Sequence, residues 1–328
     1  MQMEEFLNLL KEQGAELSSD ADAVRVTHFG DIAAELSAIG ERPLIAPLES
    51  MGRITATGKD RAKFIHNFCT NDIVSLPSGE CREAFFTDVK ARILGHGLVA
   101  AGETQHDILL LGTSSAALFA HLDRYIIMED VSLSTGDNEI GFALLDSAEA
   151  DAESGPNGVS ANWKNVKVTL VSVPGEQSIS YWQQQLSGGR KPVGMQAFDH
   201  LRIRVRYPVI GRDLTSDHLA PEADRVAGAI SYTKGCYLGQ EPIARLDAMG
   251  HINRALRSLR ISAPPEEINV GAPISDGKAE VGQVTSVAPA ETPQQSLVMS
   301  VVRLKDLDGD ALQVATRSGE GAQAQLLS

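Results

Sequence analysis

The chain has 328 residues, of which 43% are hydrophobic, 22% charged and 5% aromatic, a composition typical of folded globular proteins and unlike disordered, collagen-like or coiled-coil chains. At roughly 100 to 200 residues per domain, this length predicts two or three domains. The 43 Asp and Glu residues outnumber the 29 Lys and Arg residues, for a net charge of −14, which argues against a nonspecific nucleic-acid binder and against binding to anionic lipid.

The first residues and the cysteines predict the compartment. The chain starts with Met1-Gln2-Met3-Glu4-Glu5-Phe6, which lacks the basic residues of a signal peptide, and no apolar run approaches the roughly 18 residues of a membrane span. Cys69, Cys81 and Cys236 have neither CxxC nor His-paired spacing, so we expect reduced thiols and no metal site built from them. We therefore expect a cytoplasmic protein without membrane partners.

Hydrophobic spacing predicts mixed helices and strands up to about residue 190. The acidic stretch 149–162 has no periodicity and predicts a surface loop. Thr113 or Ser114 is the expected N-cap of a helix that ends near 128. The other expected helices are 2–13, 30–39, 59–69 and 178–187, and the expected strands, in part antiparallel, are 51–58, 81–89, 93–100, 107–111, 130–134, 140–145 and 166–170.

From about residue 256, short β-rich runs alternate with Gly, Pro and Asp clusters. The runs are 257–261, 281–287, 297–304 and 311–316. This pattern predicts a small all-β domain at the C-terminal end of the chain.

The most unusual segment lies between Tyr232 and Pro242. Two glycines there bracket Cys236, and Pro242 can open a helix that runs to about 249. A thiol near Lys234 and near a helix N-terminus would favour the reactive thiolate. The same residues also fit a Cys236 that is buried as a small hydrophobe in a tight turn, and spacing alone leaves both interpretations open.

The run Lys234-Gly235-Cys236-Tyr237-Leu238-Gly239-Gln240-Glu241 resembles the K-G-C-Y-x-G-Q-E signature of the YgfZ family, folate-binding proteins related to the glycine-cleavage T-protein (GcvT, an aminomethyltransferase). The resemblance extends from about residue 50 to the C-terminus and is weakest over 146–195. Further similar segments are 58–60, 64–67, 70–73, 211–213, 221–223, 230–233, 244–245 and 253–254.

The resemblance implies an α+β fold, a GcvT/YgfZ-like three-domain ring with mixed and antiparallel sheets, helices and a C-terminal β-barrel. The folate-binding region would be 1–255, made of two interleaved subdomains divided near 50 and 195, and the barrel would be 256–328. The resemblance also implies a central opening that takes tetrahydrofolate, and a role in the assembly or repair of iron–sulfur enzymes, which would be its protein partners. No nucleic-acid partner is expected.

Candidate site residues come from the matched motifs. Cys236 would be the functional thiol, and Lys234 would tune it. Asp72 also fits a simple turn former, because Asn and Asp side chains bond to nearby backbone in turns. The expected folate-binding residues are Asn71, Asp72, His96, Arg202, Arg204, Tyr237, Gln240, Glu241, Arg245 and Arg254.

Two positions depart from the T-protein pattern. His96 follows Gly95 where transferring T-proteins carry an acidic residue, although an imidazole there could still bond a cofactor. Arg204 stands where the R-[IL]-E-x-G element has a glutamate that binds the pterin ring, and a guanidinium cannot accept the hydrogen bonds that a carboxylate accepts. His66, His96 and His251 lack ligand spacing and are expected to be surface or hydrogen-bonded histidines.

Arg202, Arg204 and Arg206 alternate with apolar residues. In a strand, all three guanidinium groups would share one face, whereas in a helix Arg202 and Arg206 would share one. Such a cluster could hold a folate glutamate tail, a phosphate or a partner's acidic loop. It could equally be a solvated, charged sheet edge.

Three functions remain as alternatives. The first is a YgfZ-like, tetrahydrofolate-binding protein for iron–sulfur enzymes. The second is a transferase that moves a methyl or aminomethyl carbon onto tetrahydrofolate, which needs a positioned acid or base, and the pair Gly95-His96 argues against it. The third is a scaffold that has lost folate binding, as the missing carboxylates would allow.

Overall fold

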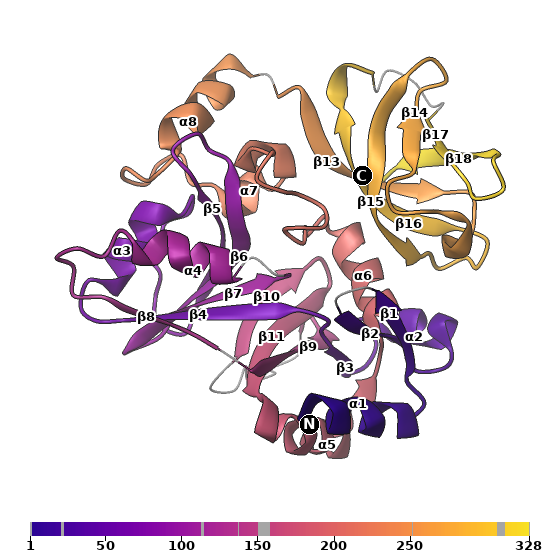
Figure 1. Cartoon of the computed structure of the whole chain (residues 1–328), viewed down its shortest axis with the longest axis horizontal. Coiled ribbons are helices and arrows are strands. Elements are labelled where there is room, and N and C mark those ends of the chain that lie inside the picture. The colour runs from indigo at the N-terminus through magenta and orange to yellow at the C-terminus, as the bar shows by residue number, and fades with distance from the viewer. Residues whose placement is uncertain are drawn as a thin grey trace.

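The computed structural model describes residues 2–20, 23–112, 115–136, 138–149, 158–250, 252–306 and 312–327. The expected helix cap at Thr113 or Ser114, and His251, lie outside these ranges. Two mixed sheet-and-helix bodies and a barrel surround the middle of the molecule (Figure 1). No helix in the described ranges is long and apolar enough to cross a membrane.

One body is a five-stranded sheet with strand order β10-β11-β9-β3-β12. Helices α1 and α5 cover one of its faces, where Phe6 and Trp182 pack edge-on to each other and against Phe142 of β9. The elements of this part of the chain are α1 (Gln2–Glu12), β1 (Glu16–Asp20), β2 (Ala23–His28), α2 (Ile32–Ala38), β3 (Leu44–Pro47), β9 (Glu139–Ser147), β10 (Gly158–Trp163), β11 (Val166–Pro174), η1 (Gly175–Gln177), α5 (Ser178–Ser187) and β12 (Lys191–Pro192).

The second body is an antiparallel five-stranded sheet with strand order β5-β6-β7-β4-β8. Phe64 and Ile65 of α3 and Leu118 and Leu122 of α4 are buried against it. Leu118 and Leu122 are four residues apart and share one face of α4, whereas the adjacent Phe64 and Ile65 point about 100° apart around α3. The elements are β4 (Met51–Thr57), α3 (Arg61–Phe68), β5 (Cys81–Thr87), β6 (Ile93–Ala101), β7 (Gln105–Leu111), α4 (Ser115–Asp123) and β8 (Ser132–Thr135).

The C-terminal part is a closed barrel with strand order β13-β16-β15-β14-β17-β18, so the predicted α+β fold with a C-terminal β-barrel is confirmed. Alternate residues such as Leu259, Ile274 and Val298 point inward and are fully buried. The elements are β13 (Arg254–Ile261), η3 (Pro265–Glu267), β14 (Pro273–Ser275), β15 (Glu280–Pro289), β16 (Ser296–Arg303), η4 (Leu304–Asp306), β17 (Leu312–Ala315) and β18 (Gly321–Leu326).

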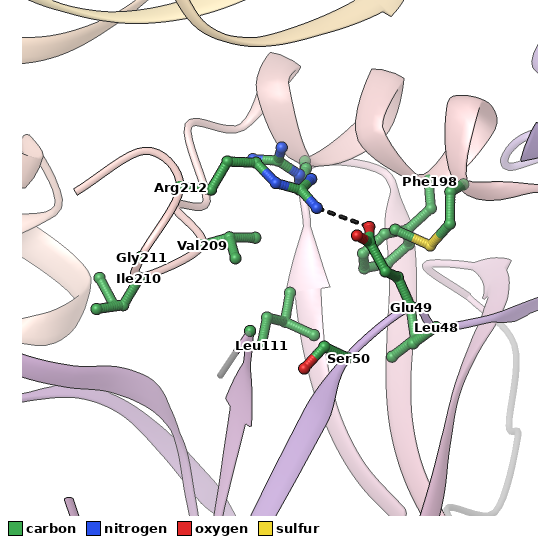
Figure 2. Close-up of a pocket in the computed structure, with 12 residues that line it drawn as sticks. Leu48, Glu49, Ser50, Leu111, Phe198, Val209, Ile210, Gly211 and Arg212 are labelled. Atoms are coloured by element: carbon green, nitrogen blue, oxygen red, sulfur yellow. Dashed lines mark hydrogen bonds and ion pairs between the residues drawn. The ribbon is translucent and has the colours of Figure 1, made fainter. Parts of the chain in front are cut away.

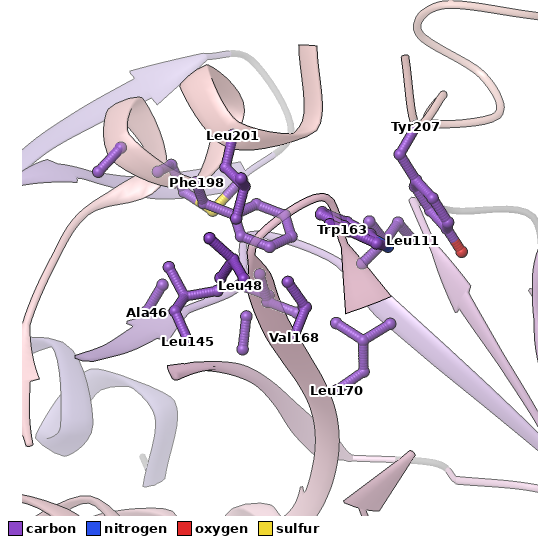
Figure 3. Packing of buried hydrophobic residues seen from close by; sticks show 14 of the residues in the cluster. Ala46, Leu48, Leu111, Leu145, Trp163, Val168, Leu170, Phe198, Leu201 and Tyr207 are labelled. Carbon is purple, nitrogen blue, oxygen red and sulfur yellow. The ribbon is translucent and has the colours of Figure 1, made fainter. Parts of the chain in front are cut away.

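Helix α6 (Met195–Arg204) joins the parts of the molecule. It contacts β2 and β3 on one side and barrel strands β15 and β16 on the other. Phe198 and Leu201 of α6 pack with Leu48 and Trp163 in the largest buried cluster (Figure 3). The remaining helices before the barrel are η2 (Ala220–Ala223), α7 (Val226–Ala229) and α8 (Gln240–Met249).

The structure differs from the sequence-based predictions at two places and decides a third that they left open. The predicted loop 149–162 is a strand from Gly158 onward, because Val159 and Trp163 are buried and the segment pairs with β11. The β1–β2 hairpin was not predicted. For the arginine-rich stretch, which the sequence allows to be a strand or a helix, the structure shows the helix, since Arg202 and Arg204 lie in the last turn of α6.

Candidate functional site

A cavity of about 190 Å³ lies where α6, the loop after it, the end of β7 and the β3–β4 link meet (Figure 2). We call it the central cavity. Much of its wall is apolar, with Leu48, Leu111, Met195, Phe198 and Val209 among the lining residues. A flat apolar group would fit such a wall.

One end of the central cavity is charged. Arg212 donates to Glu49 Oε2 at 2.7 Å, the contact drawn in Figure 2, and Arg202 also lines the cavity. Behind them lies Asp199, which is fully buried. Burial alone would raise the pKa of Asp199, but Arg202, Arg25 and Arg212 hold it below its ordinary value. This end can therefore offer both guanidinium donors and the Glu49 carboxylate as acceptor.

The narrow junction at Gly112 shapes the cavity. Gly112 has a φ of +90°, and a Cβ there would lie 2.8 Å from Ile210 O and from Val209 Cγ1. Any other residue would push the loop after α6 away from β7. The glycine thus keeps Ile210 and Val209 at the cavity wall.

The signature loop lies elsewhere, against α3. The Lys234 ammonium donates to the carbonyl oxygens of His66, Cys69 and Asn71, at 2.8 Å for the last two. These bonds use all three donors of the ammonium and satisfy carbonyls at the C-terminal end of α3. Burial lowers the pKa of Lys234. The structure therefore gives Lys234 a tethering role, whereas the sequence predicts that it tunes Cys236.

Cys236 is exposed, whereas Cys69 is buried and Cys81 half-buried. Burial raises the pKa of Cys69 and raises that of Cys81 to about 11, which disfavours their thiolates. The exposed position of Cys236 excludes the interpretation as a buried turn residue. Cys236 is thus the accessible thiol of the chain.

The rest of the signature fixes the loop. Gly239 has a φ of +85°, and a Cβ there would lie 2.5 Å from Asp88 O. Leu238 N donates to Asn67 O at 2.9 Å, and Thr87 Oγ1 donates to Leu238 O at 2.8 Å. The signature therefore packs against both α3 and β5.

The predicted folate-binding residues in and just after the signature differ in their exposure to solvent. Tyr237 is buried beneath Lys234, whose Nζ lies 4.7 Å from the ring centre, and burial raises the pKa of Tyr237 to about 12. Gln240 is half-buried in the first turn of α8. Glu241 and Arg245 are exposed on α8. None of these four lines the central cavity.

The arginines do not form one cluster. Arg202 is fully buried between Asp199 and Asp213 and donates to Ser286 Oγ at 2.6 Å. Arg204 lies about 200° further around the helix, where its half-exposed side chain pairs with Glu291 at 3.1 Å. Its guanidinium is therefore not in the central cavity. Arg206, beyond the helix, has a φ of +55° and lies 3.5 Å from Asp224 Oδ2.

His96 is buried and bonded. Its Nε2 lies 2.7 Å from Glu83 Oε1, and its ring contacts Phe85 and Tyr207. Arg225 donates two hydrogen bonds to Glu83. Within the described ranges, His96 Nδ1, Tyr207 OH and Trp163 Nε1 are buried without a hydrogen-bond partner. His96 thus belongs to the protein interior and does not line the central cavity.

Asn71 and Asp72 are used by the local fold. The Asn71 amide donates to Glu83 O at 2.8 Å and to Gly228 O at 2.9 Å. Asp72 accepts from the Ser75 hydroxyl and backbone, and these bonds, with that hydroxyl the largest cause, lower the pKa of Asp72. These contacts agree with a turn-forming role for Asp72.

Arg254 is the last of the predicted residues. It lies at the start of β13, donates to Glu222 Oε1 at 3.0 Å and lines a different cavity beside the barrel. Of the ten predicted folate-binding residues, Arg202 is the one that lines the central cavity.

Sequence reasoning missed several residues that shape the site. Glu49 lies outside every matched motif, and its partner Arg212 is 163 residues away. Arg212 and Asp213 lie in segment 211–213, which is similar to the YgfZ family, but the sequence analysis assigns them no role. Among the described residues, no group of three or more His, Cys, Asp or Glu side chains is arranged to hold a metal ion.

Comparisons with known proteins agree with this fold. No family model matches the chain. A protein of Arabidopsis thaliana, whose name suggests a chloroplastic transferase, is 29% identical over 86% of this chain and 69% of its own length. The tRNA-modifying protein YgfZ of Colwellia psychrerythraea is 22% identical over 85% of this chain and 91% of its own.

Aminomethyltransferases are similar as well. That of Chlorobium chlorochromatii is 21% identical over 75% of each chain. The crystal structure of aminomethyltransferase T of the glycine cleavage system from Bartonella henselae superposes with a TM-score of 0.83 at 16% identity, over 100% of this chain and 96% of that one. In sequence the chain is therefore similar to both YgfZ proteins and aminomethyltransferases, and it shares the fold of an aminomethyltransferase.

Proposed function

We propose that the protein binds tetrahydrofolate in the central cavity and supports the assembly or repair of iron–sulfur enzymes, with Cys236 as its functional thiol. The observation that carries the folate part is the cavity itself, which combines an apolar wall with the Glu49 carboxylate and the Arg212 guanidinium at one end. The fold shared with an aminomethyltransferase over the whole chain supports the proposal.

The residues of the cavity fit a pterin ring. Met195 and Phe198 would contact the flat ring, and Glu49 would accept hydrogen bonds from its N–H groups. Since about 190 Å³ is less than the roughly 300–1,000 Å³ of drug-sized ligand sites, the glutamate tail would extend outside. When bound, tetrahydrofolate supplies its N5 as the carrier atom for a one-carbon unit.

This assignment does without the glutamate that binds the pterin ring in the family pattern and that Arg204 replaces in this sequence. Because Arg204 points to Glu291 at the barrel, its replacement of a glutamate does not place a positive charge in the cavity. Glu49 supplies a carboxylate from another element. The missing family glutamate is therefore compatible with folate binding.

The thiol and the cavity are separate sites in this proposal. Cys236 is exposed and does not line the central cavity. It would therefore act on a client protein and not on the bound folate. The cytoplasmic location expected from the sequence remains a prediction.

Transfer of an aminomethyl or methyl group is the second candidate. The names of several relatives favour it. Of the residues that line the central cavity, Glu49 is the carboxylate that could serve as an acid or base there.

An anaerobic calorimetric titration with tetrahydrofolate tests the cavity. We expect saturable binding by the wild type and an affinity about tenfold lower for Glu49→Gln, because one charged acceptor is lost. Arg204→Gln is the control, since it changes a residue on the opposite face of α6 and should bind like the wild type. Absence of wild-type binding would reject the folate proposal in favour of a scaffold, and equal losses in both variants would reject the cavity as its site.

The thiol and the transferase alternative need separate assays. Cys236→Ser should fold normally and fail to complement a strain that lacks a YgfZ-like protein; full complementation would reject the thiol role. Formation of methylene-tetrahydrofolate and ammonia from tetrahydrofolate and an aminomethylated carrier protein, abolished in Glu49→Gln, would instead establish the transferase.

A further inference from the structure

A second cavity, of about 340 Å³, lies between the loop after α6 and the barrel strands β13, β15 and β16. We call it the barrel-side cavity. Arg212 from the loop, Arg254 from β13 and Arg303 from β16 line it together. In a chain with a net charge of −14, this convergence of three guanidinium groups from distant segments needs an explanation.

Two of these arginines are direct cross-strand neighbours. Arg254 pairs with Arg303 in the register of the antiparallel β13–β16 ladder. Like charges at directly opposed positions destabilise a sheet. The arrangement therefore costs stability that a bound anion would recover.

Donors remain free for such an anion. Arg254 uses Nε for Glu222 Oε1 and Nη2 for Asp217 O, at 3.0 and 2.6 Å. Arg303 is exposed and, within the described ranges, makes no ion pair or side-chain hydrogen bond. The remaining guanidinium edges can bind a carboxylate or a phosphate in two-pronged fashion.

Glu49 pairs with Arg212 and Glu222 pairs with Arg254, so the charge of Arg303 is the one left without a carboxylate among the described residues. Asp213 is buried and already accepts bonds from Arg202, Ser286, Thr285 and the Val209 N–H. Glu280 lies exposed on β15, where Gln283 donates to it at 3.0 Å. Glu280 is thus the carboxylate that would oppose a bound anion.

We propose that the barrel-side cavity binds a small anion with two or more negative charges, carried by carboxylate or phosphate groups. Arg254 and Arg303 form its floor, and Arg212 its inner side. Arg212 lines both cavities, whereas Arg303 and Glu280 line the barrel-side cavity and not the central one, so variants of these two residues test the anion site separately from folate binding.

Calorimetric titration with pyrophosphate and with citrate tests the proposal and separates the two chemistries. The titrations are done at about 0.15 M salt, where the Debye length of about 8 Å screens diffuse surface charge. We expect one of the two probes to bind saturably, one per chain. Failure of both to bind would overturn the proposal.

Three variants make the test specific. Arg303→Ser should weaken binding about tenfold or more, since a charge-assisted contact is lost, and Glu280→Gln should strengthen it. Arg317→Ser is the control, because Arg317 is an exposed barrel arginine outside the cavity whose Nε donates to Asn269. Equal weakening in Arg303→Ser and Arg317→Ser, or no gain in Glu280→Gln, would overturn the assignment.

Discussion

The guanidinium of Arg202 donates to Asp213 Oδ2 at 2.7 Å, and both side chains are fully buried. Asp213 in turn accepts hydrogen bonds from Thr285 and Ser286 of barrel strand β15. Through this pair, the last turn of α6 is bonded both to the loop after it and to the barrel.

Replacing Arg202 should therefore destabilise the protein far more than replacing Arg206, four residues further along the chain. We expect Arg202→Met to lower the free energy of unfolding by about 3–5 kcal/mol, because it removes the guanidinium that the buried Asp199 and Asp213 share. Arg206→Met should change it by less than about 0.5 kcal/mol, since Arg206 is partly exposed and its ion pair is long. Urea unfolding of both variants measures the difference, and similar losses would contradict the buried network.

The two signature glycines should respond differently to alanine. At Gly239 a Cβ would meet Asp88 O at 2.5 Å in a backbone with φ of +85°, so Gly239→Ala should cost about 2 kcal/mol or more. At Gly235 the nearest atom is His66 Nε2 at 3.8 Å, so Gly235→Ala should leave stability unchanged or raise it by up to about 1 kcal/mol. Thermal or urea unfolding of both variants measures the difference. Equal changes in stability for Gly239→Ala and Gly235→Ala would mean that the loop is not held against β5.

Variants of Lys234 and Cys236 should differ in stability although both lose function. Lys234→Met leaves three carbonyls at the end of α3 without their donor, so we expect a loss of about 2–3 kcal/mol. Cys236→Ser at the exposed position should stay within about 0.5 kcal/mol of the wild type. Both variants should lose function in cells, and only the first should unfold earlier. A Lys234→Met protein as stable as the wild type would instead assign Lys234 to the chemistry.

The Glu83–Arg225 pair should make stability depend on pH. Although burial opposes it, the hydrogen bonds from Arg225 and His96 lower the pKa of Glu83 to about 2. A lowered pKa contributes stability that is present above the ordinary value of 4.5 and is lost as the pH falls towards 2. The wild type should therefore be about 3 kcal/mol more stable than Glu83→Gln at pH 7, and this difference should shrink between pH 5 and 2.

Urea unfolding over this pH range measures that difference. Glu80→Gln is the matched control, because Glu80 is exposed just before the same strand and should show no such trend. A constant difference between the wild type and Glu83→Gln would mean that Glu83 does not titrate as the pairing requires.

Local patterns predict much of this fold. The helix after Gly239 and the barrel strands follow from residue spacing and turn residues. The β10 strand was missed because its partner β11 and the buried Trp163, and not its composition, determine it.

The site was less predictable, because its contacts join distant parts of the chain. Glu83 meets Arg225 across 142 residues and Glu49 meets Arg212 across 163 residues, and no local spacing encodes such pairs. Whether Arg204 lies beside Arg202 depends on whether the stretch is a strand or a helix. As a strand the stretch keeps Arg202 and Arg204 together, whereas the observed helix separates them.

The closed barrel affects how the chain can meet other proteins. A closed sheet has no edge strand to which a foreign strand could add. In the two five-stranded sheets, the edges β10 and β5 contact each other, with a hydrogen bond from Cys81 Sγ to Ser160 O. The outer edges β12 and β8 span two and four residues. The described parts of these three sheets therefore offer little template for strand addition, so client recognition and resistance to aggregation would rest on side-chain surfaces and not on backbone pairing.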